Sequence, residues 1–163
     1  MKMINTSLYG AMLLCFSFTA NAAVVQYQVS LDGAQLGGTG DADGYGYASL
    51  FIDDQALTIG WDFSVYNIAL PLTAAHIHFA PAGSNGPVVV DFAGQLNGVG
   101  HYDADLASVL ANPANYYINL HNSEYGTGAI RGQLGSPVPV PAALPLLLSG
   151  LGMLGAWGRK RLA

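Results

Sequence analysis

The sequence predicts an all-β fold, an antiparallel β-sandwich with one short helix, flanked by two terminal segments of a different kind. Three observations support this class. Segments rich in β-branched and aromatic residues, with apolar residues at every second position, recur along the central part of the chain. Turn sequences rich in Gly and Asp separate them at regular spacing. Only one short stretch has its apolar residues at helical spacing.

Seven segments of the central region are expected to be strands. In the clearest of them, residues 57–68, every second residue from Ile59 to Val65 is apolar, which is the pattern of a half-buried strand. The seven expected strands are residues 24–32, 47–53, 57–68, 74–80, 87–92, 115–121 and 129–134.

The one expected helix of this region lies in the segment "DADLASVLANP". Its apolar residues stand at i, i+3 and i+4 counted from Leu106, so they share one helical face. Asp103 or Asp105 can cap the start of the helix, and Pro113 follows its end.

The first 22 residues are typical of a secretory signal peptide, which would form a helix before it is removed. Lys2 supplies the positive start, residues 8–18 form a short apolar core, and residues 20–22, "ANA", form a cleavage site. The chain's one cysteine, Cys15, lies in this segment. The mature protein would therefore begin at Ala23, contain no disulfide and have no thiol chemistry.

The C-terminal part is expected to anchor the chain in the cytoplasmic membrane. Residues 142–158 are uncharged and largely apolar, and their length is near the lower limit for a transmembrane helix. The basic tail, residues 159–163, contains Arg159, Lys160 and Arg161 and should remain cytoplasmic. Residues 136–141, "SPVPVP", are a stiff extended linker. The body of the protein would then lie outside the cytoplasmic membrane.

The body, residues 23–135, is strongly acidic. It contains ten acidic residues and one basic residue, Arg131, which gives a net charge of −9 with neutral histidines. A nucleic-acid partner is therefore not expected, because phosphate binding needs basic side chains. The turn "GDADGYG" resembles the start of a calcium loop, but Ile52 stands where such a loop ends in an acidic ligand. A tight turn between strands is the favoured interpretation.

No pattern in the sequence predicts an enzyme. Ser108 and Ser123 lack the G-x-S-x-G context of a serine nucleophile. The paired carboxylates at residues 53–54 and at residues 103 and 105 lie in an expected turn and an expected helix cap. We therefore expect a protein without catalytic activity.

Three segments in order resemble the CHRD domain, named for its occurrence in chordin and found in bacterial exported proteins. They are "GTGDADGYGYASL", "AAHIHFAPAGSNGPVVVDF" and "NPANYYINLHNSEYGTGAIRGQL". The resemblance implies an immunoglobulin-like sandwich with a faint likeness to copper/zinc superoxide dismutase. The turn "NSEYGTGA" departs from the family's usual Pro-Gly-Gly turn, which concerns the shape of that loop. The family has no assigned biochemical activity, and we expect this exported domain to act as a binding or matrix module.

The C-terminus resembles the PEP-CTERM sorting signal, in the variant with a V-P-x-P-A motif. Val138, Pro139 and Pro141 supply the motif, and the apolar segment and basic cluster follow in the expected order. The resemblance implies recognition by an exosortase in a bacterium that makes exopolysaccharide. The body would then be released from its membrane-anchored precursor to the cell envelope or the extracellular matrix.

The histidines allow two interpretations, which the sequence leaves open. His76 and His78 are i and i+2 in an expected strand, so their side chains share a face, about 6.5–7 Å apart along the strand. Neutral imidazoles suit copper and zinc. The likeness to superoxide dismutase implies a copper site of His76, His78 and His121, with His101 as the remaining candidate ligand and Arg131 as a supporting residue. The alternative function is then a copper-binding domain for redox chemistry or metal storage, which leaves superoxide-dismutase-like activity open. The alternative is that the histidines are structural and that Arg131 pairs with an acidic residue such as Asp91 or Glu124.

Overall fold

The computed structural model describes residues 23–138. The predicted signal peptide, the sorting motif beyond Val138, the apolar segment 142–158 and the basic tail lie outside the described residues. Within residues 23–138, no helix is long and apolar enough to cross a membrane.

All seven expected strands are present, and the bounds differ from the expected ones by a few residues. An eighth strand, β6, was not expected. The strands are β1 (Val24–Asp32), β2 (Tyr45–Asp53), β3 (Thr58–Tyr66), β4 (Ala74–Phe79), β5 (Val88–Asp91), β6 (Asn97–Tyr102), β7 (Tyr116–His121) and β8 (Ile130–Gln133). The helical elements are α1 (Leu106–Ala111) and two 3-10 turns, η1 (Ala34–Leu36) and η2 (Pro113–Asn115).

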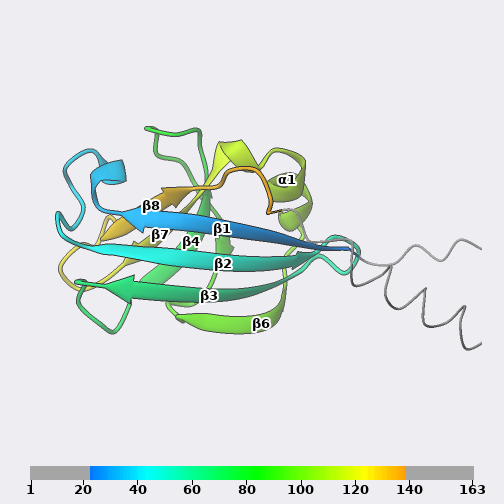
Figure 1. The fold of residues 1–163 in the computed structure, drawn as a ribbon, viewed down its shortest axis with the longest axis horizontal. Coiled ribbons are helices and arrows are strands. Elements are labelled where there is room, and N and C mark those ends of the chain that lie inside the picture. Colours follow the sequence, from blue (N-terminus) through cyan, green and yellow to red (C-terminus); the bar gives the residue numbers. More distant parts are fainter. Residues whose placement is uncertain (1–22, 139–163) are drawn as a thin grey trace, which may run out of the picture.

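The strands form one curled antiparallel sheet, not the two separate sheets of the predicted sandwich. The strand order is β5-β4-β7-β8-β1-β2-β3-β6 (Figure 1). The junction between the two halves is the pairing of β8 with β1, where Asp32 lies opposite Arg131. Because this pairing continues the ladder from one half to the other, the two layers remain one sheet that folds over a shared core.

The core lies on the concave face of the curled sheet. Every second residue of β1, β2 and β3 is buried there, and so are the apolar residues of β4, β7 and β8. Phe92, just after β5, contacts both Trp61 and Phe63 of β3, with ring centroids 4.7 and 5.3 Å apart. These aromatic contacts bring the two halves of the sheet together and give the fold its sandwich-like character.

Strand β6 depends on glycine. A side chain at Gly98 would overlap the indole ring of Trp61, which lies directly opposite on β3. Gly100 has a φ of 71°, a conformation that favours glycine. Glycines are poor strand formers and carry no alternating pattern, so this edge strand has no local signal in the sequence.

The helix and the acidic turn are where they were expected. Leu106 and Val109 of α1 are buried. The side chain of Asp105 at the N-cap makes no capping bond; instead, Asp103 Oδ1 accepts a bond from the backbone N–H of Asp105, at 2.9 Å. In the turn before β2, the N–H of Gly44 donates to the carbonyl of Asp41 at 3.3 Å. The favoured interpretation of "GDADGYG" as a tight turn is therefore confirmed.

Candidate metal centre

Strand β7 is buried on both of its faces. All six of its residues are buried, although an antiparallel strand usually has one wet face. Ile118 and Leu120 face the core, whereas Tyr117, Asn119 and His121 have the opposite parity and lie on the convex face. Polar side chains that are buried outside the core must be shielded from water by other segments of the chain. They also need hydrogen-bond partners within the protein.

Two loops provide this cover. In residues 80–87, the Gly86 N–H donates to the Tyr117 hydroxyl at 3.3 Å. In residues 122–129, the carbonyl of Thr127 accepts a bond from Asn119 Nδ2 at 3.1 Å. Gly128 in this second loop has a φ of 136°, and a Cβ there would overlap the Asn119 amide, so the loop can lie this close only with glycine.

The register of β4 on β7 brings three of the four predicted ligands together. His76 lies opposite Asn119, and His78 lies opposite Tyr117. His121 lies two residues further along β7 than Asn119, diagonal to His76. One ring nitrogen of each histidine lies within 4.8 Å of the other two. The closest pair is His76 Nδ1 and His121 Nε2, at 3.4 Å.

The structure does not bring His101 to this cluster. His101 is on β6, at the other end of the strand order, where its ring meets Trp61 edge-on at a centroid distance of 6.2 Å. Only β4 and β7 therefore contribute imidazoles to the centre.

Backbone carbonyls fix the orientation of two of the three rings. His78 Nδ1 lies 2.9 Å from the carbonyl oxygen of Gly86, and His121 Nδ1 lies 3.0 Å from the carbonyl oxygen of Gly126. Since a carbonyl only accepts hydrogen bonds, each Nδ1 must carry the proton. The Nε2 atoms of both neutral rings are then left with a lone pair.

Asp91 is the corresponding partner of the third ring, that of His76. His76 Nε2 lies 3.6 Å from Asp91 Oδ1, and the two residues are opposite each other on β4 and β5. With the proton of His76 on Nε2, the Nδ1 lone pair faces the cluster. A carboxylate or carbonyl behind each imidazole is the usual outer arrangement of a histidine metal site.

Burial favours the neutral form of His76 and His78. Desolvation lowers the pKa of His76 below its ordinary value, the neighbouring His121 lowers it further, and Asp91 opposes the shift. Desolvation is also the main reason why the pKa of His78 is lowered; the bond to Gly86 opposes this, and His76, His121 and Arg131 add to it. Neutral imidazoles are the form that binds metal, so protons compete weakly at neutral pH.

The residues fit a metal ion. His78 Nε2 is buried and has no hydrogen-bond partner among the described residues. A buried polar atom without a partner is costly in a folded protein. The separation of 3.4 Å between His76 Nδ1 and His121 Nε2 is close to that of two ligands on one tetrahedral ion with bonds of about 2.0–2.1 Å. Three nitrogen ligands without a thiolate suit divalent copper or zinc and leave a coordination position open.

The structural interpretation proposed that Arg131 pairs with an acidic residue such as Asp91 or Glu124. Arg131 pairs with neither of them. Its guanidinium lies over the ring of Tyr117, 3.4 Å from the centroid, and desolvation lowers its pKa. His78 stacks on the same tyrosine at a centroid distance of 4.9 Å and an interplanar angle of 8°. Tyr117 comes from β7, between β4 and β8, and therefore separates the histidine cluster from the arginine.

Sequence reasoning missed the partners of the imidazoles. The carbonyls of Gly86 and Gly126 have no side-chain signal, because any residue has a carbonyl. The sequence suggests Asp91 only as a partner of Arg131. Its place four residues after Pro87, in the strand that pairs with the H-x-H strand, is the one signal that could have found it.

A comparison with known families places most of the described residues in one group. Residues 27–134 match the CHRD domain. No curated protein and no solved structure matches the chain. The match covers β2 to β8, most of β1, all three clustered histidines and both loops that cover them.

Proposed function

The chain belongs to the CHRD domain family, and we propose that it is a binding module without catalytic activity that holds one transition-metal ion. His76, His78 and His121 are the ligands. Asp91 and the carbonyls of Gly86 and Gly126 hold the rings from behind. The ion itself would supply an open coordination position for a further ligand.

One observation carries this proposal. Each of the three rings has one nitrogen directed at an acceptor outside the cluster, so the other nitrogen offers a lone pair to the cluster. The interpretation as purely structural histidines does not account for His78 Nε2, which is buried without a partner. A metal ion would satisfy this nitrogen and the nitrogens of His76 and His121 together.

Copper is the ion that we propose. Imidazole binds several divalent metals, and affinity for a given nitrogen site is greatest for divalent copper. The cluster contains no sulfur ligand, because the body has no cysteine. Zinc is the competing ion, because three imidazoles and an open position also suit it.

Titration of the untagged full chain tests the proposal. The chain is freed of metal by chelation and dialysis and then titrated with copper and with zinc in a calorimeter, and its melting temperature is measured with each ion. Copper at about 100 times its Kd should stabilise the fold by about 2.7 kcal/mol. The double variant His78→Gln/His121→Gln should lose this stabilisation, whereas the control His101→Gln should keep it.

Two results would contradict the metal proposal. One is the absence of a heat and of a melting shift with both ions. The other is equal stabilisation of the wild type and the double variant, which would place the bound ion elsewhere on the acidic surface. Either result would leave the structural interpretation of the histidines.

We further propose that the chain is exported and sorted to the cell envelope or the extracellular matrix. The support is the order of signal peptide, acidic body, V-P-x-P-A motif, apolar segment and basic cluster. The membrane-anchored precursor would be the substrate of an exosortase, and exopolysaccharide or another matrix component would be the neighbour of the released body. Replacing Pro139 and Pro141 by Ala in the native host should leave the uncleaved precursor in the membrane fraction. Release of the variant at the normal rate would refute sorting through this motif.

A further inference from the structure

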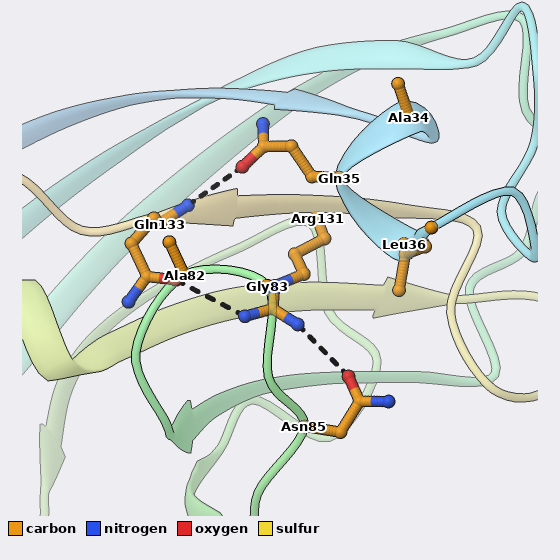
Figure 2. Close-up of a pocket in the computed structure, with 9 residues that line it drawn as sticks. Ala34, Gln35, Leu36, Ala82, Gly83, Asn85, Arg131 and Gln133 are labelled. Atoms are coloured by element: carbon orange, nitrogen blue, oxygen red, sulfur yellow. Dashed lines mark hydrogen bonds between the residues drawn. The ribbon is translucent and has the colours of Figure 1, made fainter.

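A second site lies beyond Tyr117, on the side away from the histidines. A cavity of about 340 Å³ opens between η1 and the loop of residues 81–85, over strand β8 (Figure 2). Its volume is at the lower end of the range of small-molecule sites, which is about 300–1,000 Å³. Arg131 is the only charged residue among those that line it, and small residues such as Ala34, Ala82 and Gly83 leave it open.

Arg131 is a buried cation without an acidic partner. Its side chain is 2 % exposed, and no carboxylate of residues 23–138 lies within the 4.0 Å of a salt bridge. Asp32 is opposite it on β1, but both carboxylate oxygens of Asp32 accept bonds from Gln35. Burying a charge is costly unless the charge is paired, so the site has a charge left to neutralise.

The hydrogen bonds of Arg131 leave part of its guanidinium unused. Two bonds, to Asn85 Oδ1 at 3.1 Å and to Gln133 Oε1 at 3.3 Å, are visible in Figure 2. A third bond goes to the carbonyl of Pro81 at 3.5 Å. An arginine has five N–H groups, so two donate to none of the described residues. The Asn85 amide nitrogen also donates to none of them. The cavity therefore has a surplus of donors and one positive charge.

We propose that this cavity binds the carboxylate of a small hydroxylated acid about the size of a monosaccharide, such as a uronate. An ionised carboxylate only accepts hydrogen bonds, and it can take a charge-assisted bond from an N–H group of Arg131 that remains free on Nε or Nη1, since both N–H groups of Nη2 are used. The amide nitrogen of Asn85, which lines the cavity, can donate to a hydroxyl group of the acid. A polyanion is the wrong ligand, because the body's net charge of −9 repels it.

This proposal does not rest on the metal centre. None of the three clustered histidines lines the cavity, and the ring of Tyr117 lies between His78 and Arg131. Binding of the acid should therefore be measurable on the metal-free chain, and a failure of either proposal leaves the other standing.

Calorimetric titration of the metal-free full chain with glucuronate tests the proposal, with glucose as the matched neutral sugar. Glucuronate should bind and glucose should bind at least about tenfold more weakly, because the carboxylate's charged hydrogen bonds are lost. Glucose binding as tightly as glucuronate, or no binding of glucuronate, would overturn the proposal.

Two variants locate the bound acid. Arg131→Gln should weaken glucuronate binding by about tenfold or more. Because this variant can also unfold the chain, Ala82→Trp is the second test: it fills the cavity from an exposed loop position and keeps the side chain of Arg131. Ala107→Trp, at an exposed position of α1, is its control and should bind as the wild type does. Unchanged binding in Ala82→Trp would place the acid outside this cavity.

Discussion

The Nε2 atom of His76 lies 3.6 Å from the Oδ1 atom of Asp91, the residue opposite it on the neighbouring strand. The Asp91 side chain is 65 % exposed. A contact to a carboxylate this exposed contributes little to stability, even when His76 is protonated. Its consequence is chemical: the carboxylate sets which nitrogen of His76 faces the cluster.

Asp91→Asn should therefore weaken metal binding more than it weakens the fold. We expect a loss of about 10-fold or more in copper affinity, the usual effect of removing a partner behind a ligating histidine. The free energy of unfolding of the metal-free chain should change by less than about 1 kcal/mol. Calorimetric titration and urea unfolding measure the two quantities. Asp62→Asn, at an exposed position of β3, is the control, and equal copper affinity in the two variants would refute the role of Asp91.

The metal-free chain should lose stability as the pH falls below about 6.5. The pKa values of His76 and His78 are lowered in the fold, mainly by burial, and return to about 6.5 on unfolding. The unfolded chain therefore binds more protons between the folded pKa values and about 6.5. The free energy of unfolding is fully present above this window and decreases as the pH falls through it.

Urea unfolding of the metal-free chain at several pH values checks this dependence. His78→Gln removes one of the two groups with a lowered pKa, so the variant should show a smaller slope just below pH 6.5. Identical slopes for the variant and the wild type would show that His78 does not contribute.

Gly132→Ala should destabilise the sheet where its two halves join. A Cβ at this position of β8 would overlap the carbonyl oxygen of Ser30 and the side chains of Val29 and Leu31 on β1. Overpacking of this kind costs about 1–3 kcal/mol. Gly135→Ala is the matched control, because a Cβ there meets open space. Urea unfolding compares the two, and equal free energies of unfolding would argue against close packing of β8 on β1.

The mature chain should begin at Ala23. The short apolar core of residues 8–18 and the sequence "ANA" at residues 20–22 predict cleavage there. N-terminal sequencing of the exported protein measures the first residue. A chain that starts at Met1 would refute the signal peptide, whereas a start one or two residues from Ala23 would only move the cleavage site.

The strands could be predicted from the sequence because their signal is local. Alternation of apolar residues is enough to identify β1, β2 and β3, whose inner faces are buried as expected. The continuity of the sheet could not be predicted in this way. It depends on the pairing of β8 with β1, residues that are about a hundred positions apart, and on the close approach that Gly132 permits.

The candidate site also has one part that could be predicted from the sequence and another part that could not. The shared face of His76 and His78 follows from their spacing alone. The approach of His121 depends on the pairing of β7 with β4, which no local pattern encodes. The acceptors behind the rings are harder still, because Gly86 and Gly126 act through their backbone and only the loop conformation makes them partners.

The direction of β1 determines how the molecule would be presented on a surface. The N–H of Val138 donates to the carbonyl of Gln26 at 2.8 Å, near the start of β1, whereas Arg131 lies opposite Asp32 at its end. Six residues of strand separate these two positions, about 20 Å. Figure 1 shows both ends of the described chain leaving on one side of the molecule and the turn η1 on the opposite side. An attachment at either end of the described chain would therefore lie at the end of β1 that is remote from Arg131 and would leave the arginine cavity unobstructed.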